Sequence, residues 1–200
     1  MSKINVPIPQ QNFELVRDKI AQILALEFGN QYTLTGNELM NLNVWVERFI
    51  AFDKVELPAI NVVFDQTNYN HNDANTSAGD NRYNIFVINR ASHTASQRGD
   101  TRATQELNRI MGIARYIIMH PAYHTLDFAP GFIFGRNVDM MRAIEPTDQG
   151  DGTQTIAAQM SATVRMNEHN GAIAPVSGEI VSTSVKLAET DKGYYYYYET

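Results

Sequence analysis

Three groups of side chains in this sequence could hold a metal ion or move a proton. His120 and His124 have the i, i+4 spacing that places two imidazoles on one face of a helix, as in many zinc sites. Pro121 lies between them, and because proline breaks a helix the spacing does not predict a shared face. The sequence also lacks the Glu that follows the first histidine of the metalloprotease motif. We therefore interpret the two residues as a histidine pair at a helix C-terminus, where the helix dipole favours positive charge.

A second group, in the segment DQGDG, resembles part of a calcium-binding loop. It contains Asp148, Asp151 and Gly152. A calcium loop of the EF-hand type needs ligands at alternate positions and a terminal Glu, and the sequence supplies neither. Because Asp and Gly are the residues that a tight connection requires, the segment is predicted to be a turn between two strands.

The third group lies in residues 66–81 (QTNYNHNDANTSAGDN), which are predicted to form a long polar loop. His71, Asp73 and Asp80 could supply a carboxylate–histidine pair for proton transfer. Long loops on a rigid scaffold more often carry contacts, so an assembly contact is favoured over catalysis. Together with Tyr69, these three residues are the candidate contact residues of the loop.

The sequence ends in an unusual run of five tyrosines. One interpretation is a strand whose alternate tyrosines pack on the sheet. The other is an interface anchored by Tyr194, Tyr196 and Tyr198, because tyrosine supplies a large amphipathic contact area. The sequence leaves both interpretations open.

Two amphipathic helices must position these residues. The first is predicted from about 13 to 27, with Asn12 as its N-cap and Gly29 as its stop. The second is predicted from about 101 to 119, with Asp100 as its N-cap. Its continuous apolar stripe consists of Ala103, Leu107, Ile110, Met111, Ala114, Ile117 and Ile118.

Strands are predicted at Val44–Phe49, Ala59–Asp65, Tyr83–Arg90, Phe132–Ile144, Ile156–Met166 and Val176–Leu187. This order predicts the α+β class: a single domain with a mainly antiparallel β-sheet and two helices packed on it. Residues 1–11 are predicted to form an extended arm, 12–168 the α+β domain, and 169–200 a C-terminal strand and tyrosine-rich tail. Trp45 is predicted to lie in the core.

The second of these strands is apolar on nearly every residue. Ile60, Val62 and Phe64 point one way, and Ala59 and Val63 point the other. Such a run is typical of a strand that is covered on both faces, whether by a helix or by a neighbouring subunit.

The composition bounds the class of protein. The chain has 200 residues, 44% of them hydrophobic and 19% charged, which is typical of a globular domain with a sizeable core. Its net charge of -6 and scattered Lys and Arg predict neither sequence-specific nucleic-acid binding nor a membrane partner. It contains no cysteine, no apolar run of membrane-spanning length and no visible secretory signal. We therefore expect a soluble protein made in a cytoplasm.

Four segments, in their order and spacing, resemble a known family. They are FDKVELPAINVVF (52–64), NIFVINR (84–90), GRNVDMMRAIEP (135–146) and QMSATVRMNE (159–168). With the two helices, they resemble the tail terminator proteins of long-tailed bacteriophages, also called tail completion or minor tail proteins. The resemblance covers about residues 12–168. The polar stretch 66–81 and the last 32 residues depart from the short members of that family.

The resemblance implies a virion protein of the tail or neck, made in the host cytoplasm. It implies a homo-oligomeric ring, expected to be hexameric, that caps the tail tube protein, stops its polymerisation and provides the docking surface for a head–tail connector or neck protein. It implies no catalytic residues, no metal and no cofactor. Three alternatives stay open: another head–tail connector or neck protein, a phage enzyme with 66–81 as a pocket lid, and a small binding module unrelated to phages.

Overall fold

The computed structural model describes residues 5, 7–49, 52–71, 76–91, 99–148, 154–169, 184–190 and 193–199. The chain divides into two compact units, Met1–Asn170 and Gly171–Thr200. No helix among the described residues is long and apolar enough to cross a membrane.

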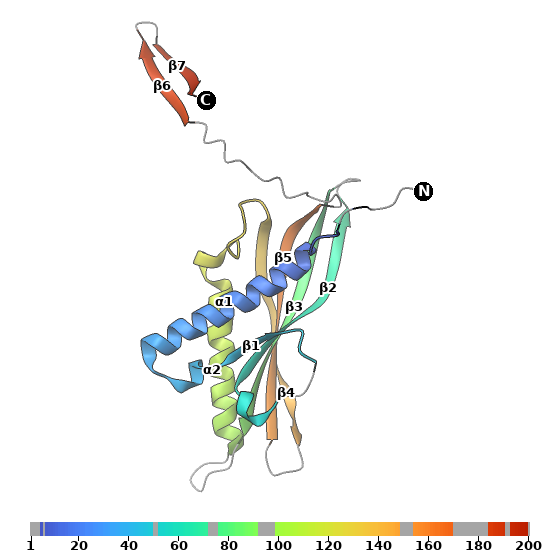
Figure 1. Cartoon of the computed structure of the whole chain (residues 1–200). Coiled ribbons are helices and arrows are strands. Elements are labelled where there is room, and N and C mark those ends of the chain that lie inside the picture. Colours follow the sequence, from blue (N-terminus) through green and yellow to red (C-terminus); the bar gives the residue numbers. More distant parts are fainter. Residues whose placement is uncertain are drawn as a thin grey trace. The chain divides into compact units, whose positions relative to one another are not determined.

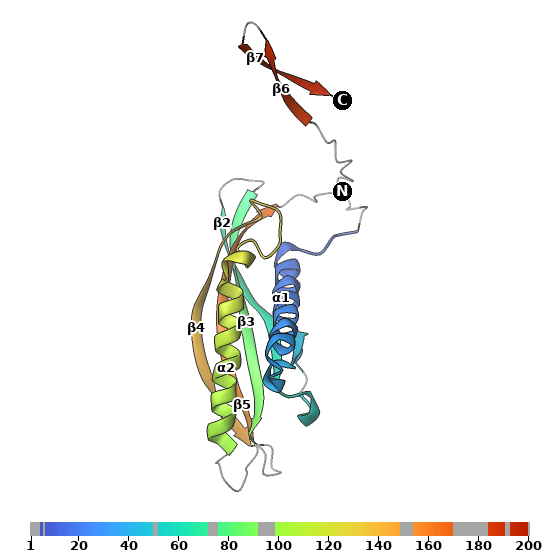
Figure 2. The same ribbon diagram turned by 90° about the vertical axis from the view of Figure 1, so that its left-hand side faces the viewer.

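The first unit is a single α+β domain with two helices packed against a five-stranded, mostly antiparallel sheet. Its elements are α1 (Asn12–Thr35), η1 (Glu38–Met40), β1 (Asn43–Val46), η2 (Lys54–Glu56), β2 (Ala59–His71), β3 (Thr76–Ala91), α2 (Gly99–Met119), η3 (Pro121–Tyr123), β4 (Ile133–Asp148) and β5 (Gln154–His169). The strand order is β1-β2-β3-β5-β4, and only the β1–β2 pair is parallel. Both helices lie on the same face of the sheet (Figures 1 and 2). We call the opposite face the open face.

Helix α1 starts one residue earlier and ends eight residues later than predicted. The N-cap is Gln11, not Asn12, and it forms a capping box with Glu14, whose carboxylate accepts the Gln11 N–H at 2.7 Å. Gly29 lies inside the helix, which ends at Gly36, a residue with φ 62°. A helical glycine costs about 1 kcal/mol relative to alanine. Burying Phe28, which is 1% exposed, contributes about 2–3 kcal/mol, so tertiary packing carries the helix past the glycine.

The predicted long loop over 66–81 is wrong, because β2 and β3 continue through most of it as a hairpin. Their pairing runs from Ala59↔Ile88 to His71↔Ser77 with one bulge between Phe64 and Gln66. The distal part of β3 also pairs with β5, for example at Asp80↔Arg165. Polar composition alone does not distinguish a loop from a polar strand. Because β3 pairs with a strand on each side, its backbone N–H and C=O groups are hydrogen-bonded whatever its side chains are.

The core lies between the helices and the sheet. The predicted apolar stripe of α2 is confirmed, because all seven of its residues are buried. The predicted alternation along β5 is also confirmed: the side chains of one face are at most 4% exposed, and they are Ile156, Ala158, Met160, Ala162, Val164 and Met166. On β3 the corresponding buried positions are Tyr83, Ile85 and Val87. Helix α2 begins at Gly99, so Asp100 lies in its first turn rather than before it.

Two other strands depart from their predicted bounds. β1 ends at Val46 instead of residue 49, because Glu47 adopts a left-handed conformation with φ 49° and turns the chain. β4 runs on to Asp148, and its pairing with β5 contains three irregularities. Bulges of this kind are a common way of blunting an edge strand.

The second unit contains an antiparallel hairpin of β6 (Ser184–Thr190) and β7 (Gly193–Glu199). The predicted strand Val176–Leu187 therefore overlaps β6 only from Ser184, and residues 176–183 lie outside the described residues. The tyrosine run forms most of β7.

Candidate functional site

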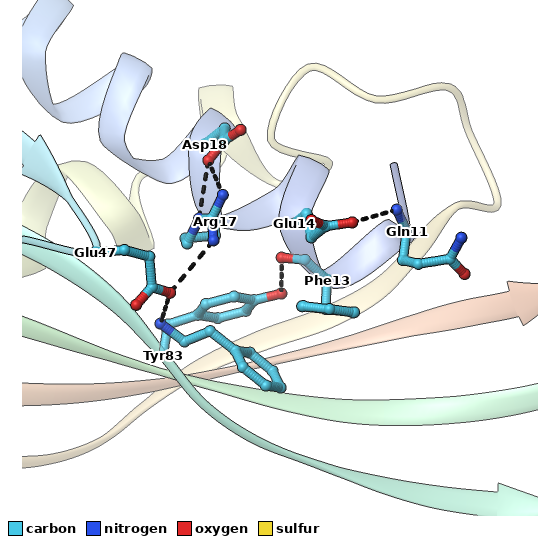
Figure 3. A network of polar contacts seen from close by, with 8 residues as sticks. Gln11, Phe13, Glu14, Arg17, Asp18, Glu47 and Tyr83 are labelled. Carbon is cyan, nitrogen blue, oxygen red and sulfur yellow. Dashed lines mark hydrogen bonds and ion pairs between the residues drawn. The ribbon is translucent and has the colours of Figure 1, made fainter. Parts of the chain in front are cut away.

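The candidate site is built around two stretches between β1 and β2, residues 47–49 and 52–57, which we together call the strap. Glu47 starts it. Its N–H donates to the carbonyl of Val62 at 3.0 Å, and its carboxylate accepts the N–H of Phe64 at 2.8 Å. The same carboxylate pairs with Arg17 of α1 at 3.3 Å (Figure 3). Glu47 thus forms hydrogen bonds with backbone groups of β2 beyond the end of β1. Its ion pair with Arg17 links this edge of the sheet to α1.

The other contact in this network joins the sheet to the start of α1. The hydroxyl of the buried Tyr83 donates to the carbonyl of Phe13 at 3.0 Å (Figure 3). The ring of Phe64 packs between the two, with centroids 4.6 Å from Phe13 and 6.0 Å from Tyr83. The first turn of α1 is therefore fixed over β2 and β3, next to the strap.

The strap is held on the open face by Asn61, which is 5% exposed. Its side-chain amide accepts the N–H of Arg48 at 3.1 Å and donates to the carbonyl of Arg48 at 2.8 Å. These are the two hydrogen bonds that a neighbouring strand residue would make. A buried amide left without partners costs about 1–3 kcal/mol, so Asn61 and the strap stabilise one another.

The guanidinium of Arg48 fixes the far end of the strap. It donates to both carboxylate oxygens of Glu56, at 2.8 and 2.7 Å, and its Cζ lies 4.4 Å from the ring centroids of Trp45 and Phe52. Glu56 also accepts the N–H of Asp53 at 2.8 Å. The hydrogen bonds from Arg48, and then that from Asp53, lower the pKa of Glu56 below its ordinary value. Glu56 is thus kept ionised, and both of its carboxylate oxygens accept hydrogen bonds from the strap.

Beside this strap lies a groove of about 560 Å³ on the open face, here called the aromatic groove. Phe49 and Phe52 of the strap form one wall. Val63 of β2 and Phe86 and Ile88 of β3, all half-buried, form the floor. Phe49 is 80% exposed, although the strap that carries it is fixed by the contacts above. A large apolar side chain exposed beside an apolar groove is typical of a contact surface.

The polar side chains that line the aromatic groove are engaged in structural contacts. Arg48 and Asn61 hold the strap, and Asn84 accepts the hydroxyl of Ser161 at 2.9 Å. Asp65 is exposed at the rim. The groove therefore offers apolar area with a polar rim, which suits the burial of another chain's apolar side chains. Among the described residues no three His, Asp or Glu side chains are grouped so that they could hold a metal ion.

Of the four candidate contact residues of 66–81, the three that the structure describes, Tyr69, His71 and Asp80, lie on β2 and β3, and none of them lines the aromatic groove. Tyr69 is 51% exposed on β2. Asp80 on β3 pairs with Arg165 of β5 at 2.7 Å, and these hydrogen bonds lower the pKa of Asp80. His71 is the last residue of β2, and Asp73 lies outside the described residues. The structure does not bring His71 and Asp80 into opposition, because His71 pairs with Ser77.

The histidine pair is placed at a helix end as predicted. Helix α2 ends at Met119, and His120 caps η3 by accepting the N–H of Ala122 at 3.2 Å on its ring nitrogen. Arg136 of β4 donates hydrogen bonds to the backbone carbonyls of His120 and Tyr123. A side chain of the sheet therefore provides donors for carbonyl groups that follow the end of α2.

The remaining predicted positions are placed as follows. Asp148 ends β4, whereas Asp151 and Gly152 lie outside the described residues. Tyr194, Tyr196 and Tyr198 occupy alternate positions of β7, and their backbones pair with Glu189, Leu187 and Val185 of β6.

Sequence reasoning missed the aromatic groove. Phe49 and Phe52 flank a charged turn and were not singled out. Asn61 is the polar exception within the apolar stretch Ala59–Phe64, and such an exception is the available signal of a buried amide with a specific partner. Trp45, predicted to be a core residue, is half-buried against Arg48, and its buried Nε1 has no hydrogen-bond partner among the described residues.

No family model matches the chain, and no curated protein matches it.

Proposed function

We propose that the protein is a structural virion subunit that forms a ring on the end of a phage tail tube, stops tail polymerisation and presents a docking surface to the head or neck. The observation that carries this proposal is the aromatic groove: a pre-formed apolar surface on a sheet face that the helices leave open. In such a function the protein acts by shape. It needs no catalytic residue and no cofactor.

The placement of the four segments named above also supports the proposal. FDKVELPAINVVF forms the end of the strap and the start of β2, and NIFVINR forms the part of β3 that floors the groove. GRNVDMMRAIEP and QMSATVRMNE form paired stretches of β4 and β5. The segments that carry the resemblance thus meet in one sheet.

A ring requires contacts between two different patches of successive copies, related by a rotation that closes. The open face and the edge at β2, where β1 covers only Ala59–Val62, provide one such patch. A closed ring then presents one face to the tube and another that tube subunits cannot extend. This is the mechanism of capping that we propose.

The test locates the chain in assembled particles. Particles produced from the genome that encodes this chain should carry an antibody label against it at the junction of tail and head. Loss of the chain should give tails of uncontrolled length or tails without heads. Native mass spectrometry of the purified protein at rising concentration, alone and with tube ends, should reveal a ring.

Three outcomes would contradict this function. They are tails of normal length and normal heads in the absence of the chain, one copy of the chain per tail, and a label found away from the tail end. A label on the head side of the neck, with normal tail length, would favour a neck protein instead.

A further inference from the structure

We infer that the aromatic groove binds the N-terminal arm, residues 5–11, of a second copy of this chain. This inference rests on the proposed ring only in that it names the contact between successive copies.

The arm carries apolar side chains that its own domain leaves in solvent. The described arm residues, 5 and 7–11, are all exposed, and Ile8 is 70% exposed. Pro7 and Pro9 flank Ile8, and proline fixes the backbone near the polyproline II conformation. Such a segment loses little conformational entropy when it binds.

The groove matches this chemistry. Proline-rich, extended segments dock in grooves lined by aromatic side chains. Phe49, Phe52 and Phe86 supply three aromatic rings, and Val63 and Ile88 supply an apolar floor. A volume of about 560 Å³ accommodates a few side chains of the size of Ile and Pro.

The arm of the same copy begins at α1, on the helix-covered face of the sheet (Figures 1 and 2). Gln11 closes the capping box of α1 and donates from its side chain to the carbonyl of Pro9 at 2.9 Å, which fixes the base of the arm. Helix α1 lies on the opposite face of the sheet from the groove. To enter the groove of its own copy, the arm would have to turn around the edge of the sheet, which a stiff segment with Pro7 and Pro9 disfavours. We therefore place the contact between copies.

Exchange of arms is a contact between two different patches, arm on one copy and groove on the next. Contacts of this kind propagate from copy to copy and close into a ring when the rotation allows it. Binding of the arm of one copy to the groove of the next is thus the contact that joins successive subunits of the ring.

The first experiment titrates the peptide MSKINVPIPQQ into the full chain at a concentration where the chain is monomeric. Trp45, the single tryptophan, reports binding by its fluorescence because its ring stacks on Arg48 of the groove. We expect a saturable change that is weakened at least tenfold by Phe49→Ser or by Ile8→Ser in the peptide. The matched control is Val55→Ser, which alters another exposed residue of the strap, outside the groove lining, and should change binding less than twofold. No saturable change, or equal binding by Phe49→Ser, overturns the inference.

The second experiment distinguishes one copy from two. The chain has no cysteine, so single cysteines can be placed at Ile8 and at Asp65 on the groove rim. A mixture of Ile8→Cys and Asp65→Cys proteins should form a disulfide-linked dimer under mild oxidation. Ile8→Cys mixed with Gln22→Cys, an exposed position on α1, should not. A third protein carries both Ile8→Cys and Asp65→Cys. A disulfide that forms only within a single chain of this double variant, or no specific disulfide at all, overturns binding between copies.

The two proposals fail in distinguishable ways. Rings seen by native mass spectrometry without the Ile8–Asp65 disulfide would defeat the arm exchange and leave the ring. Arm-linked copies that are absent from tail ends would defeat the tail function and leave the arm exchange.

Discussion

The side-chain amide of Asn61 makes both backbone hydrogen bonds of Arg48, as a strand partner would. Arg48 is thus hydrogen-bonded to the sheet as a strand residue would be, although it belongs to no strand. This contact holds the strap, and with it Phe49 and Phe52, over the open face. The geometry of the aromatic groove therefore depends on one buried amide.

The first prediction is that Asn61→Ala loosens the strap and removes the groove. The N–H and carbonyl of Arg48 lose their partners, and the expected loss of stability is about 1–3 kcal/mol in urea unfolding. Trp45 emission should shift to the red as Arg48 leaves its ring. Gln22→Ala on the exposed side of α1 is the control and should change stability by less than about 0.5 kcal/mol. A groove that still binds the arm peptide in Asn61→Ala would contradict this role.

The second prediction concerns acid. Because Arg48 and the N–H of Asp53 lower the pKa of Glu56, the folded pKa lies below the unfolded value of about 4.3. The stabilisation is therefore fully present above about pH 4.3 and is lost as pH falls through the lowered folded pKa. Glu56→Gln should weaken the strap at neutral pH and flatten the acid-dependent change in Trp45 fluorescence. An unchanged acid titration in Glu56→Gln would show that other groups control the strap.

The third prediction concerns alkali. A hydrogen bond from the Tyr123 hydroxyl to the carboxylate of Glu27 raises the pKa of Tyr123 to about 12. Its contribution to stability is full below about pH 10, the ordinary tyrosine value, and is lost as pH rises through 12. In a phenolate absorbance titration, Tyr123→Phe should remove a late-titrating group. Loss of a phenolate that forms near pH 10 instead would contradict the contact.

The fourth prediction uses two glycines of the α1 region with opposite backbone requirements. Gly29 is helical, and an added Cβ would meet nothing within 4 Å, so Gly29→Ala should stabilise the domain by about 0.5–1 kcal/mol. Gly36 has φ 62°, so Gly36→Ala should destabilise it by about 1 kcal/mol. Thermal unfolding of the two variants measures both. Equal effects would show that α1 ends elsewhere in solution.

The fifth prediction concerns the tyrosine run. If Tyr194, Tyr196 and Tyr198 anchor contacts between subunits or to a neck protein, replacing all three by Ser should weaken assembly, since an interface anchor is worth about 2 kcal/mol or more. Thermal unfolding of the first unit should stay nearly unchanged, because the run belongs to a separate compact unit. Tyr195→Ser with Tyr197→Ser, at the intervening positions of β7, is the matched control. Unfolding of the first unit by the triple substitution would assign the three tyrosines to its core.

The sequence by itself determined the elements whose side chains repeat with a clear period. The apolar stripe of α2 and the alternation from Ile156 to Met166 each place one face in the core, and burial follows from that period alone. The α+β class follows from the order of these elements.

Tertiary structure decided the features that depend on partners distant in sequence. Helix α1 continues past Gly29 because Phe28 is buried in the core, and residues 66–71 and 76–81 form strands because β3 pairs on both sides. The groove arises where Asn61 meets Arg48, thirteen residues earlier in the chain. Local sequence does not encode such pairings, because the free energy of a buried polar contact depends on both partners and on the surface that excludes water around them.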